Sequence, residues 1–171
     1  MEIIKTKDFT LRSYKKGDEE SLATNINDET IHKYTCKIPY PYTEKDAKKW
    51  IKHCYKVGNQ DKINEINFAI DINGEVIGGI GLKNIENNKG EIGYWIGKGY
   101  RKKGITTQAV SLVSEFGFEK LKLKKITAPI HPKNKASARV LEKNNFKCRG
   151  LVPKEEVKDC KFDVLMYVNV K

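Results

Sequence analysis

The sequence of 171 residues lacks any apolar run near the roughly 18–20 residues that a membrane-spanning helix needs. Its first residues contain no apolar stretch followed by small residues, so we expect no secretory signal and a cytoplasmic location. Cysteine is scarce as well, and the four cysteines form no CxxC pair and no zinc-finger spacing with histidine. We therefore expect reduced thiols, with no disulfide framework and no metal, at Cys36, Cys54, Cys148 and Cys160.

The chain also lacks internal repeats and any linker rich in Pro, Gly or Ser, and its length suits one domain over residues 1–171. Charge is not balanced, because 33 Lys and Arg face 22 Asp and Glu, for a net charge of +11. Such an excess indicates either a polyanionic ligand or only a solvated basic surface. The lysines are spread through the whole chain, which favours the solvated surface unless a local cluster argues otherwise.

Hydrophobic periodicity and turn residues predict an α+β fold built around one mixed sheet. Three signals are specific: Thr43 with Asp46 as a helix-capping pair, Asn73-Gly74 as a hairpin turn, and Asn134 as a helix cap. The expected strands cover residues 9–14, 66–72, 75–85, 90–97, 124–130, 146–152 and 161–170. The expected helices begin near residues 18, 29, 43, 105 and 134.

The segment from Trp95 to Thr107 has the strongest chemical signal. A strand ends, a glycine- and lysine-rich loop follows, and an amphipathic helix begins. Free backbone N–H groups and the partial positive charge of a helix N-terminus bind anions such as a pyrophosphate. The loop is neither a Walker loop nor a dinucleotide fingerprint, and a basic turn without a ligand is the alternative. Its glycines and basic residues are Gly97, Gly99, Gly104, Lys98, Arg101, Lys102 and Lys103.

The run from residue 91 to 110 resembles the central signature of GCN5-related N-acetyltransferases (GNAT), a strand followed by an [RQ]xxGx[GA] loop and a helix. Arg101, Gly104 and Thr106 stand at its positions, with Thr106 where Gly or Ala is usual. Residues 134–146 resemble a second family motif, and Asn145 replaces its usual Gly. This stretch is similar to the Rim-type branch, which acetylates ribosomal-protein N-termini and small amines.

The resemblance implies a GNAT acyl-CoA N-acyltransferase fold, with a mixed, mostly antiparallel sheet flanked by helices and a splayed central strand. By the same resemblance, acetyl-CoA would fill the gap beside that strand, and a primary amine would attack its thioester directly. The implied cofactor-binding residues hold the pantetheine arm and thioester carbonyl at the strand end and the pyrophosphate in the loop. They are Trp95, Ile96, Arg101, Lys102, Lys103, Gly104, Ile105, Thr106 and Asn134.

The resemblance also implies catalytic roles. Ser137 would face the CoA sulfur and donate to the departing thiolate, since Leu141 stands where many relatives carry a tyrosine. Glu156 is the expected general base, with Glu91 as a second candidate. Simpler interpretations stay open, namely helix capping for Ser137, a solvated loop charge for Glu156 and a salt bridge for Glu91.

We thus expect an N-acetyltransferase that acts on a protein N-terminus or a small-molecule amine, away from membranes. A ribosomal-protein contact and a homodimer are further expectations. The alternatives are a CoA-binding protein without catalysis and a basic module associated with the ribosome or nucleic acid. The sequence contains no RRM, KH or helix-turn-helix signature, which argues against the nucleic-acid module.

Overall fold

The computed structural model describes residues 3–158 and 160–171. The longest helices have 15 residues, and within the described residues no helix has the length and apolar character to cross a membrane. The strands are β1 (Ile4–Lys5), β2 (Thr10–Arg12), β3 (Ile66–Ile72), β4 (Glu75–Glu86), β5 (Lys89–Ile96), β6 (Lys125–Ile130), β7 (Lys147–Val152) and β8 (Val164–Val170). The helices are α1 (Glu19–Ile26), α2 (Glu29–Tyr34), α3 (Glu44–Gly58), α4 (Ile105–Glu119) and α5 (Lys135–Lys143), with 3₁₀ turns η1 (Lys98–Tyr100) and η2 (Lys154–Glu156).

One mixed sheet contains all of these strands, in the order β1-β2-β3-β4-β5-β6-β8-β7. Every neighbouring pair is antiparallel except β5 and β6, which are parallel. This confirms the predicted α+β class with a mixed, mostly antiparallel sheet. The short strand β1 was not predicted, because two residues cannot show an alternating pattern.

Three of the local turn and cap signals act as predicted. Thr43 and Asp46 form a reciprocal capping box at the start of α3, and the Asn134 side chain accepts from the third backbone N–H of α5. Asn73 and Gly74 both have positive φ, 54° and 88°, as a tight hairpin turn requires. Asp18 precedes α1 as expected, but its carboxylate makes no cap hydrogen bond.

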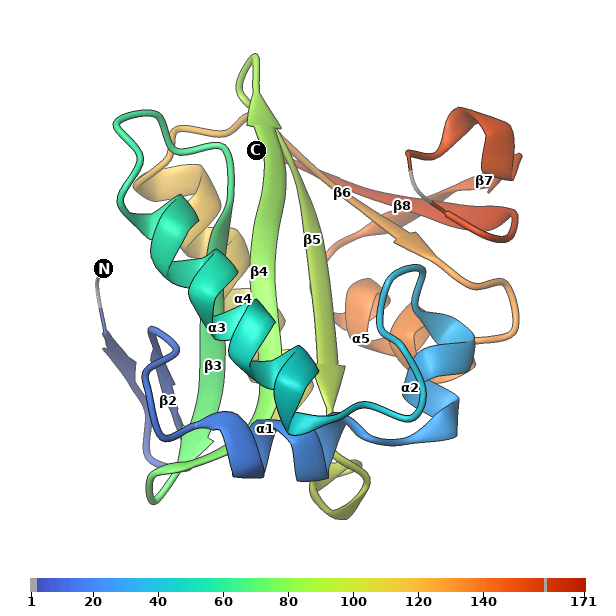
Figure 1. The fold of residues 1–171 in the computed structure, drawn as a ribbon. Coiled ribbons are helices and arrows are strands. Elements are labelled where there is room, and N and C mark those ends of the chain that lie inside the picture. The colour runs from blue at the N-terminus through green and yellow to red at the C-terminus, as the bar shows by residue number, and fades with distance from the viewer. Residues whose placement is uncertain (1–2, 159) are drawn as a thin grey trace.

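The two faces of the sheet carry separate hydrophobic cores. Phe68, Ile70 and Ile77 belong to the core that contains the buried face of α4. Ala69 and Val76 point the opposite way, into the core formed with α1 and α3. In Figure 1, α1 and α3 lie in front of the central strands and α4 lies behind them. This alternation follows from the two-residue side-chain period of a strand.

The two parallel strands separate along their length. Residues 89–91 of β5 pair with residues 125–127 of β6, and the pairing ends there. β5 stays paired with β4 as far as Ile96, while β6 continues alongside β8. Figure 1 shows β5 and β6 diverging toward the bottom of the view, where α5 and α2 lie. The predicted splay of the central strand is therefore present.

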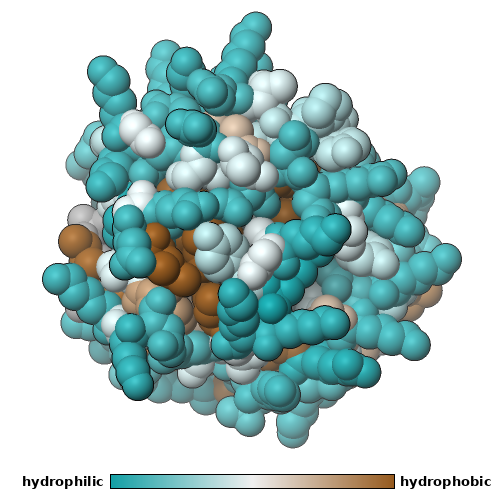
Figure 2. Space-filling model, turned by 90° about the horizontal axis from the view of Figure 1, so that it is seen from below, coloured by the Kyte–Doolittle hydropathy of each residue, from teal (hydrophilic) through white to brown (hydrophobic). Residues whose placement is uncertain are grey.

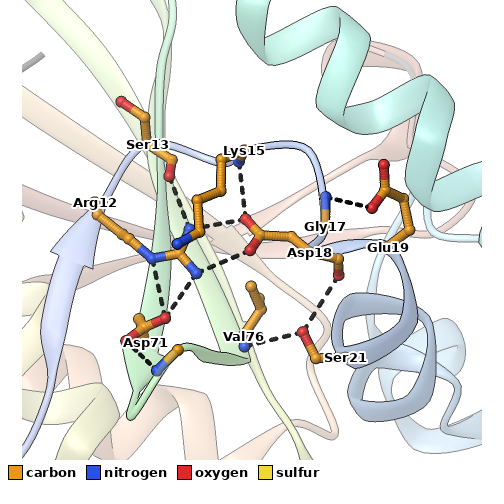
Figure 3. A network of polar contacts seen from close by, with 10 residues as sticks. Arg12, Ser13, Lys15, Gly17, Asp18, Glu19, Ser21, Asp71 and Val76 are labelled. Atoms are coloured by element: carbon orange, nitrogen blue, oxygen red, sulfur yellow. Dashed lines mark hydrogen bonds and ion pairs between the residues drawn. The ribbon is translucent and has the colours of Figure 1, made fainter.

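A half-buried arginine, Arg12, connects segments that are distant in the sequence. The Arg12 guanidinium donates to both carboxylate oxygens of Asp18, at 2.8 and 2.9 Å, and to one oxygen of Asp71, at 2.9 Å from Nε and 2.6 Å from a terminal nitrogen. Figure 3 shows this fork between β2, the start of α1 and the hairpin that follows β3. Asp71 also accepts from the backbone N–H of Gly74 in that hairpin. The cluster thus ties three elements together with charge-assisted hydrogen bonds.

The expectation that all four thiols are reduced was wrong for one pair. Cys36 and Cys160 form a disulfide across a sequence separation of 124 residues, while Cys54 and Cys148 are free. Cys36 lies in the loop between α2 and α3, and Cys160 lies in the loop between β7 and β8. Spacing alone gave no sign of this pair, because the fold brings together loops from opposite ends of the chain.

Candidate active site

The loop between β5 and α4 ends in a left-handed turn. Gly104 precedes α4 with a φ of 78°, and Lys102 has a φ of 62°. Gln108 is the first residue whose N–H bonds back into the helix, to the Gly104 carbonyl at 3.0 Å. Within the described residues, no partner accepts from the N–H groups of Ile105 and Thr106. The first turn of α4 therefore presents backbone N–H groups that the helix itself does not use, as helix N-termini generally do.

The side chains of this loop are largely exposed. Lys102 and Lys103 reach solvent, and the Lys103 ammonium lies 5.4 Å from the centroid of the Tyr100 ring. Both lysines therefore stand beside the first turn of α4 with their charges available to a phosphate. Figure 2 views the molecule from below, the side on which this loop lies in Figure 1. Hydrophilic side chains surround a central area where hydrophobic residues reach the surface.

The end of β5 leaves one edge free of strand pairing. The N–H of Gly97 donates to the Ile77 carbonyl at 2.9 Å, on the β4 side. Because N–H directions alternate along a strand, the N–H of Ile96 points to the other edge, into the opening beside β6. Trp95 pairs with Gly79, where a side chain would collide with the Trp95 indole nitrogen at 2.5 Å. Of the two predicted strand positions, Ile96 therefore offers its backbone to the opening.

The Arg101 side chain contacts two other parts of the protein. Its terminal nitrogen lies 3.3 Å from an Asp28 carboxylate oxygen, and its Nε donates to the Ile96 carbonyl at 3.4 Å. Burial opposes ionisation of Asp28, but the Arg101 charge and the backbone donors Thr30 and Ile31 outweigh it, so the pKa of Asp28 is lowered. Sequence reasoning missed Asp28. Arg101 thus links the end of β5 to the cap of α2.

Ser137 and Asn134 meet different partners at the start of α5. The Asn134 side chain accepts from the Ser137 N–H at 3.2 Å, which is a capping contact. The buried Ser137 hydroxyl lies 2.6 Å from the hydroxyl of Tyr94 on β5. Sequence reasoning missed Tyr94, although strand alternation places it on the same face as Ile92 and Ile96. The capping role falls to Asn134, and the Ser137 hydroxyl is directed toward β5.

The two carboxylates considered as general bases lie on different elements. Glu156 is exposed in η2, within the loop that leads to β8. Glu91 lies where β5 still pairs with β6, and its carboxylate is 2.8 Å from the Lys83 ammonium. The salt-bridge interpretation of Glu91 therefore agrees with this contact. Glu156 has the solvent access that an acceptor amine would need.

Three aromatic rings pack together just beyond the end of β6. The His131 ring, just after β6, lies 5.1 Å from the ring of Tyr34 and 4.5 Å from that of Phe162. Tyr34 and Phe162 each stand two residues from a cysteine of the disulfide. His131 Nδ1 accepts from the Lys133 N–H at 3.0 Å, and burial with the charges of Lys133 and Lys33 lowers its pKa. The loops after α2 and β7 are thereby held together beside the end of β6.

Comparisons with known proteins agree with this geometry. The family model of the acetyltransferase (GNAT) domain matches residues 8–147. The uncharacterised N-acetyltransferase p20 of Bacillus licheniformis is 29% identical over 174 aligned residues, which cover 100% of this chain and 97% of p20.

Two solved structures share the fold across almost their whole length. One is RimL, a ribosomal L7/L12 α-N-protein acetyltransferase in complex with coenzyme A, with a TM-score of 0.86 at 19% identity, covering 99% of this chain and 98% of RimL. The other is the ribosomal-protein-S5-alanine acetyltransferase of Vibrio fischeri, with a TM-score of 0.83 at 20% identity and coverages of 99% and 97%. Because the domain model spans most of the chain and a relative matches it from end to end, the protein belongs to the GNAT family and is an N-acetyltransferase that uses acetyl-CoA.

Proposed function

We propose that acetyl-CoA binds in the opening where β5 and β6 part, and that a primary amine enters from the side of the α2–α3 and β7–β8 loops. The observation that carries this proposal is the end of strand pairing after Glu91 and Thr127. In this proposal, the free edge of β5, the first turn of α4 and the Ser137 hydroxyl all face the bound cofactor. The N–H groups of residues 102–106 would bind the pyrophosphate, and the N–H of Ile96 would donate to the pantetheine or the thioester carbonyl.

The proposed reaction is direct acyl transfer. The neutral amine attacks the thioester carbonyl carbon, the C–S bond breaks, and the sulfur leaves with the electron pair as a thiolate. The amine proton passes to Glu156 or to water. The Ser137 hydroxyl stabilises the charge that builds on the sulfur, and such a donor acts mainly on kcat.

For the acceptor, we propose a protein N-terminus or a small-molecule amine. RimL and the Vibrio fischeri enzyme are named for acetylating ribosomal proteins, and the net charge of +11 suits a partner that carries phosphates or carboxylates. An α-amine has a reference pKa of about 7.7–8.0, against about 10.4 for lysine. An exposed base such as Glu156 is therefore more adequate for an N-terminus than for lysine.

Release of free CoA thiol across N-terminal peptides, polyamines and aminoglycosides tests this function. We expect thiol release that requires both acetyl-CoA and one of these amines. Acetyl-CoA and desulfo-CoA should both raise the melting temperature, because each binds only the folded protein. If neither ligand shifts the melting temperature at millimolar concentration, the proposed cofactor position is wrong.

Ser137→Ala tests the leaving-group role. We expect kcat to fall by about 10- to 1,000-fold, since one such donor contributes on the order of 10²–10³ in rate and water can replace it in part. The KM for acetyl-CoA should stay within about twofold, because the contact matters most in the transition state. Ser111→Ala, at an exposed serine of α4, is the control and should keep the parent kcat. A parent-like kcat in Ser137→Ala would rule out the role.

A further inference from the structure

Tyr94 reaches from β5 to the residue proposed to act on the departing sulfur. It lies beyond the last β5–β6 pair and still pairs with Ile80 of β4 on its other side. Its hydroxyl oxygen is 2.6 Å from Ser137 Oγ and 3.3 Å from the Ser137 carbonyl oxygen. The shorter distance is typical of a good O–H···O hydrogen bond. The contact joins two elements that are 43 residues apart.

The role of this contact depends on which hydroxyl donates. Each hydroxyl has one proton and can also accept. Either hydroxyl can donate across the 2.6 Å contact, and the Tyr94 hydroxyl also donates toward the Ser137 carbonyl at 3.3 Å. A phenol is the stronger acid and therefore the better donor, so we assign the Tyr94 hydroxyl as the donor to Ser137 Oγ in the shorter contact. The serine proton is then left for another acceptor. In the described residues, Tyr94 is the only hydrogen-bond partner of Ser137 Oγ.

Without Tyr94, the serine hydroxyl would have a local alternative. A serine in the first turn of a helix readily turns back to bond a nearby backbone carbonyl, which would consume its proton. The Tyr94 hydroxyl holds Oγ toward β5 instead. One turn further along α5, the residue at the position after Ser137 on the same face is Leu141, which is fully buried and has no hydroxyl to take over the role of Ser137.

Burial also keeps Tyr94 in its donor form. Desolvation raises the pKa of the phenol, and the hydrogen bond with Ser137 offsets only part of that rise. The phenol therefore stays protonated at neutral pH. It orients the serine and does not itself give up a proton.

We propose that Tyr94 is a positioning residue for Ser137: its hydroxyl donates to Ser137 Oγ and leaves the serine proton free to bind the departing CoA sulfur. This proposal rests on the leaving-group role of Ser137 proposed above. No proton changes owner in this contact. The C–S electron pair goes to the sulfur, and the serine hydrogen bond stabilises the resulting thiolate.

Tyr94→Phe removes the hydroxyl and keeps the ring. We expect kcat to fall about tenfold, the worth of one hydrogen bond in the transition state, with the KM for acetyl-CoA within about twofold of the parent. The matched control is Tyr167→Phe, because the Tyr167 hydroxyl donates to Glu142 of the same helix at 3.1 Å. That variant loses an equivalent tyrosine contact to α5 and should keep the parent kcat.

The double variant Tyr94→Phe/Ser137→Ala tests whether Tyr94 acts through Ser137. It should have the kcat of Ser137→Ala alone, since the positioning group has nothing left to position. A double variant whose loss of kcat equals the product of the two single losses would overturn the proposal, as would a parent-like kcat in Tyr94→Phe. A parent-like kcat in Ser137→Ala would instead disprove the role on which the proposal rests.

3-Fluorotyrosine at position 94 separates loss of the hydroxyl from damage to the fold. It keeps both the ring and the hydroxyl, so kcat should stay within about twofold of the parent if the hydroxyl is what matters. The melting temperature of each variant, with and without acetyl-CoA, reports whether the protein is folded. A folded fluorotyrosine protein as slow as Tyr94→Phe would overturn the proposal.

Discussion

At the scale of single residues, Arg12 combines burial with several charge-assisted contacts. Its side chain is 12% exposed, and its carboxylate partners Asp18 and Asp71 are 1% and 11% exposed. Removing one member of such a cluster leaves the remaining charges buried without compensation. Lys83 offers a contrast, because its ion pair with Glu91 involves an ammonium side chain that is 44% exposed.

Arg12→Met should therefore destabilise the protein by about 3–5 kcal/mol, because it leaves two buried carboxylates without their positively charged partner. Urea unfolding followed by circular dichroism measures the change. Arg12→Lys keeps the charge but loses the two-pronged guanidinium, so its free energy of unfolding should lie between those of Arg12→Met and the parent. The control Lys83→Met should cost no more than about 1 kcal/mol. Equal losses in Arg12→Met and Lys83→Met would contradict this account.

At the scale of elements, the turn from β5 into α4 determines where the helix presents its first N–H groups. Gly104 occupies the left-handed region just before α4, with a φ of 78°. Gly99, in the same loop, has an ordinary φ, and a Cβ added there would meet no atom within 4 Å. Comparing alanine variants at the two positions therefore distinguishes the effect of the backbone conformation from the effect of an added methyl group.

Gly104→Ala should cost roughly 1–2 kcal/mol, the usual penalty for a residue with a Cβ in this conformation. It should also weaken acetyl-CoA binding, because any relaxation of the turn redirects the N–H groups of Ile105 and Thr106. Gly99→Ala should match the parent in both respects. Thermal unfolding and calorimetric titration with acetyl-CoA measure the two effects. Identical behaviour of the two variants would exclude a special role for the Gly104 turn.

At the scale of the whole molecule, the Cys36–Cys160 disulfide joins the first and last quarters of the chain. It lies beside the rings of Tyr34, His131 and Phe162, which pack at the end of β6. Cross-linking residues this far apart restricts the unfolded chain strongly, and loss of a native disulfide costs about 2–5 kcal/mol.

Reductant should therefore lower the melting temperature by roughly 5–15 °C in a protein of this size. Cys36→Ser should show the lower value with and without reductant. The control Cys148→Ser, at an exposed free thiol, should keep both the parent melting temperature and its sensitivity to reductant. Four reactive thiols in the unreduced parent, with no effect of reductant, would show that the pair is not formed in solution.

The sequence by itself determined most of the framework, because its signals are local. The capping pair Thr43 and Asp46, the Asn73-Gly74 turn and the helical stripe after Gly104 act through neighbours a few residues away, so each could be read from a short window. The strand-loop-helix order around Arg101 predicted an anion site in the same way. The family resemblance then supplied the splay and the place of Ser137.

Only the tertiary structure decided which side chains meet. Tyr94 with Ser137, Arg101 with Asp28, and Cys36 with Cys160 are contacts between distant segments. No periodicity encodes such pairs, because they depend on how far β5 and β6 part and on which loops pack against their ends. The same packing left Glu91 in a salt bridge and Glu156 exposed. The local sequence determines which helices and strands form. The free energy of packing these elements together determines which side chains meet at their ends.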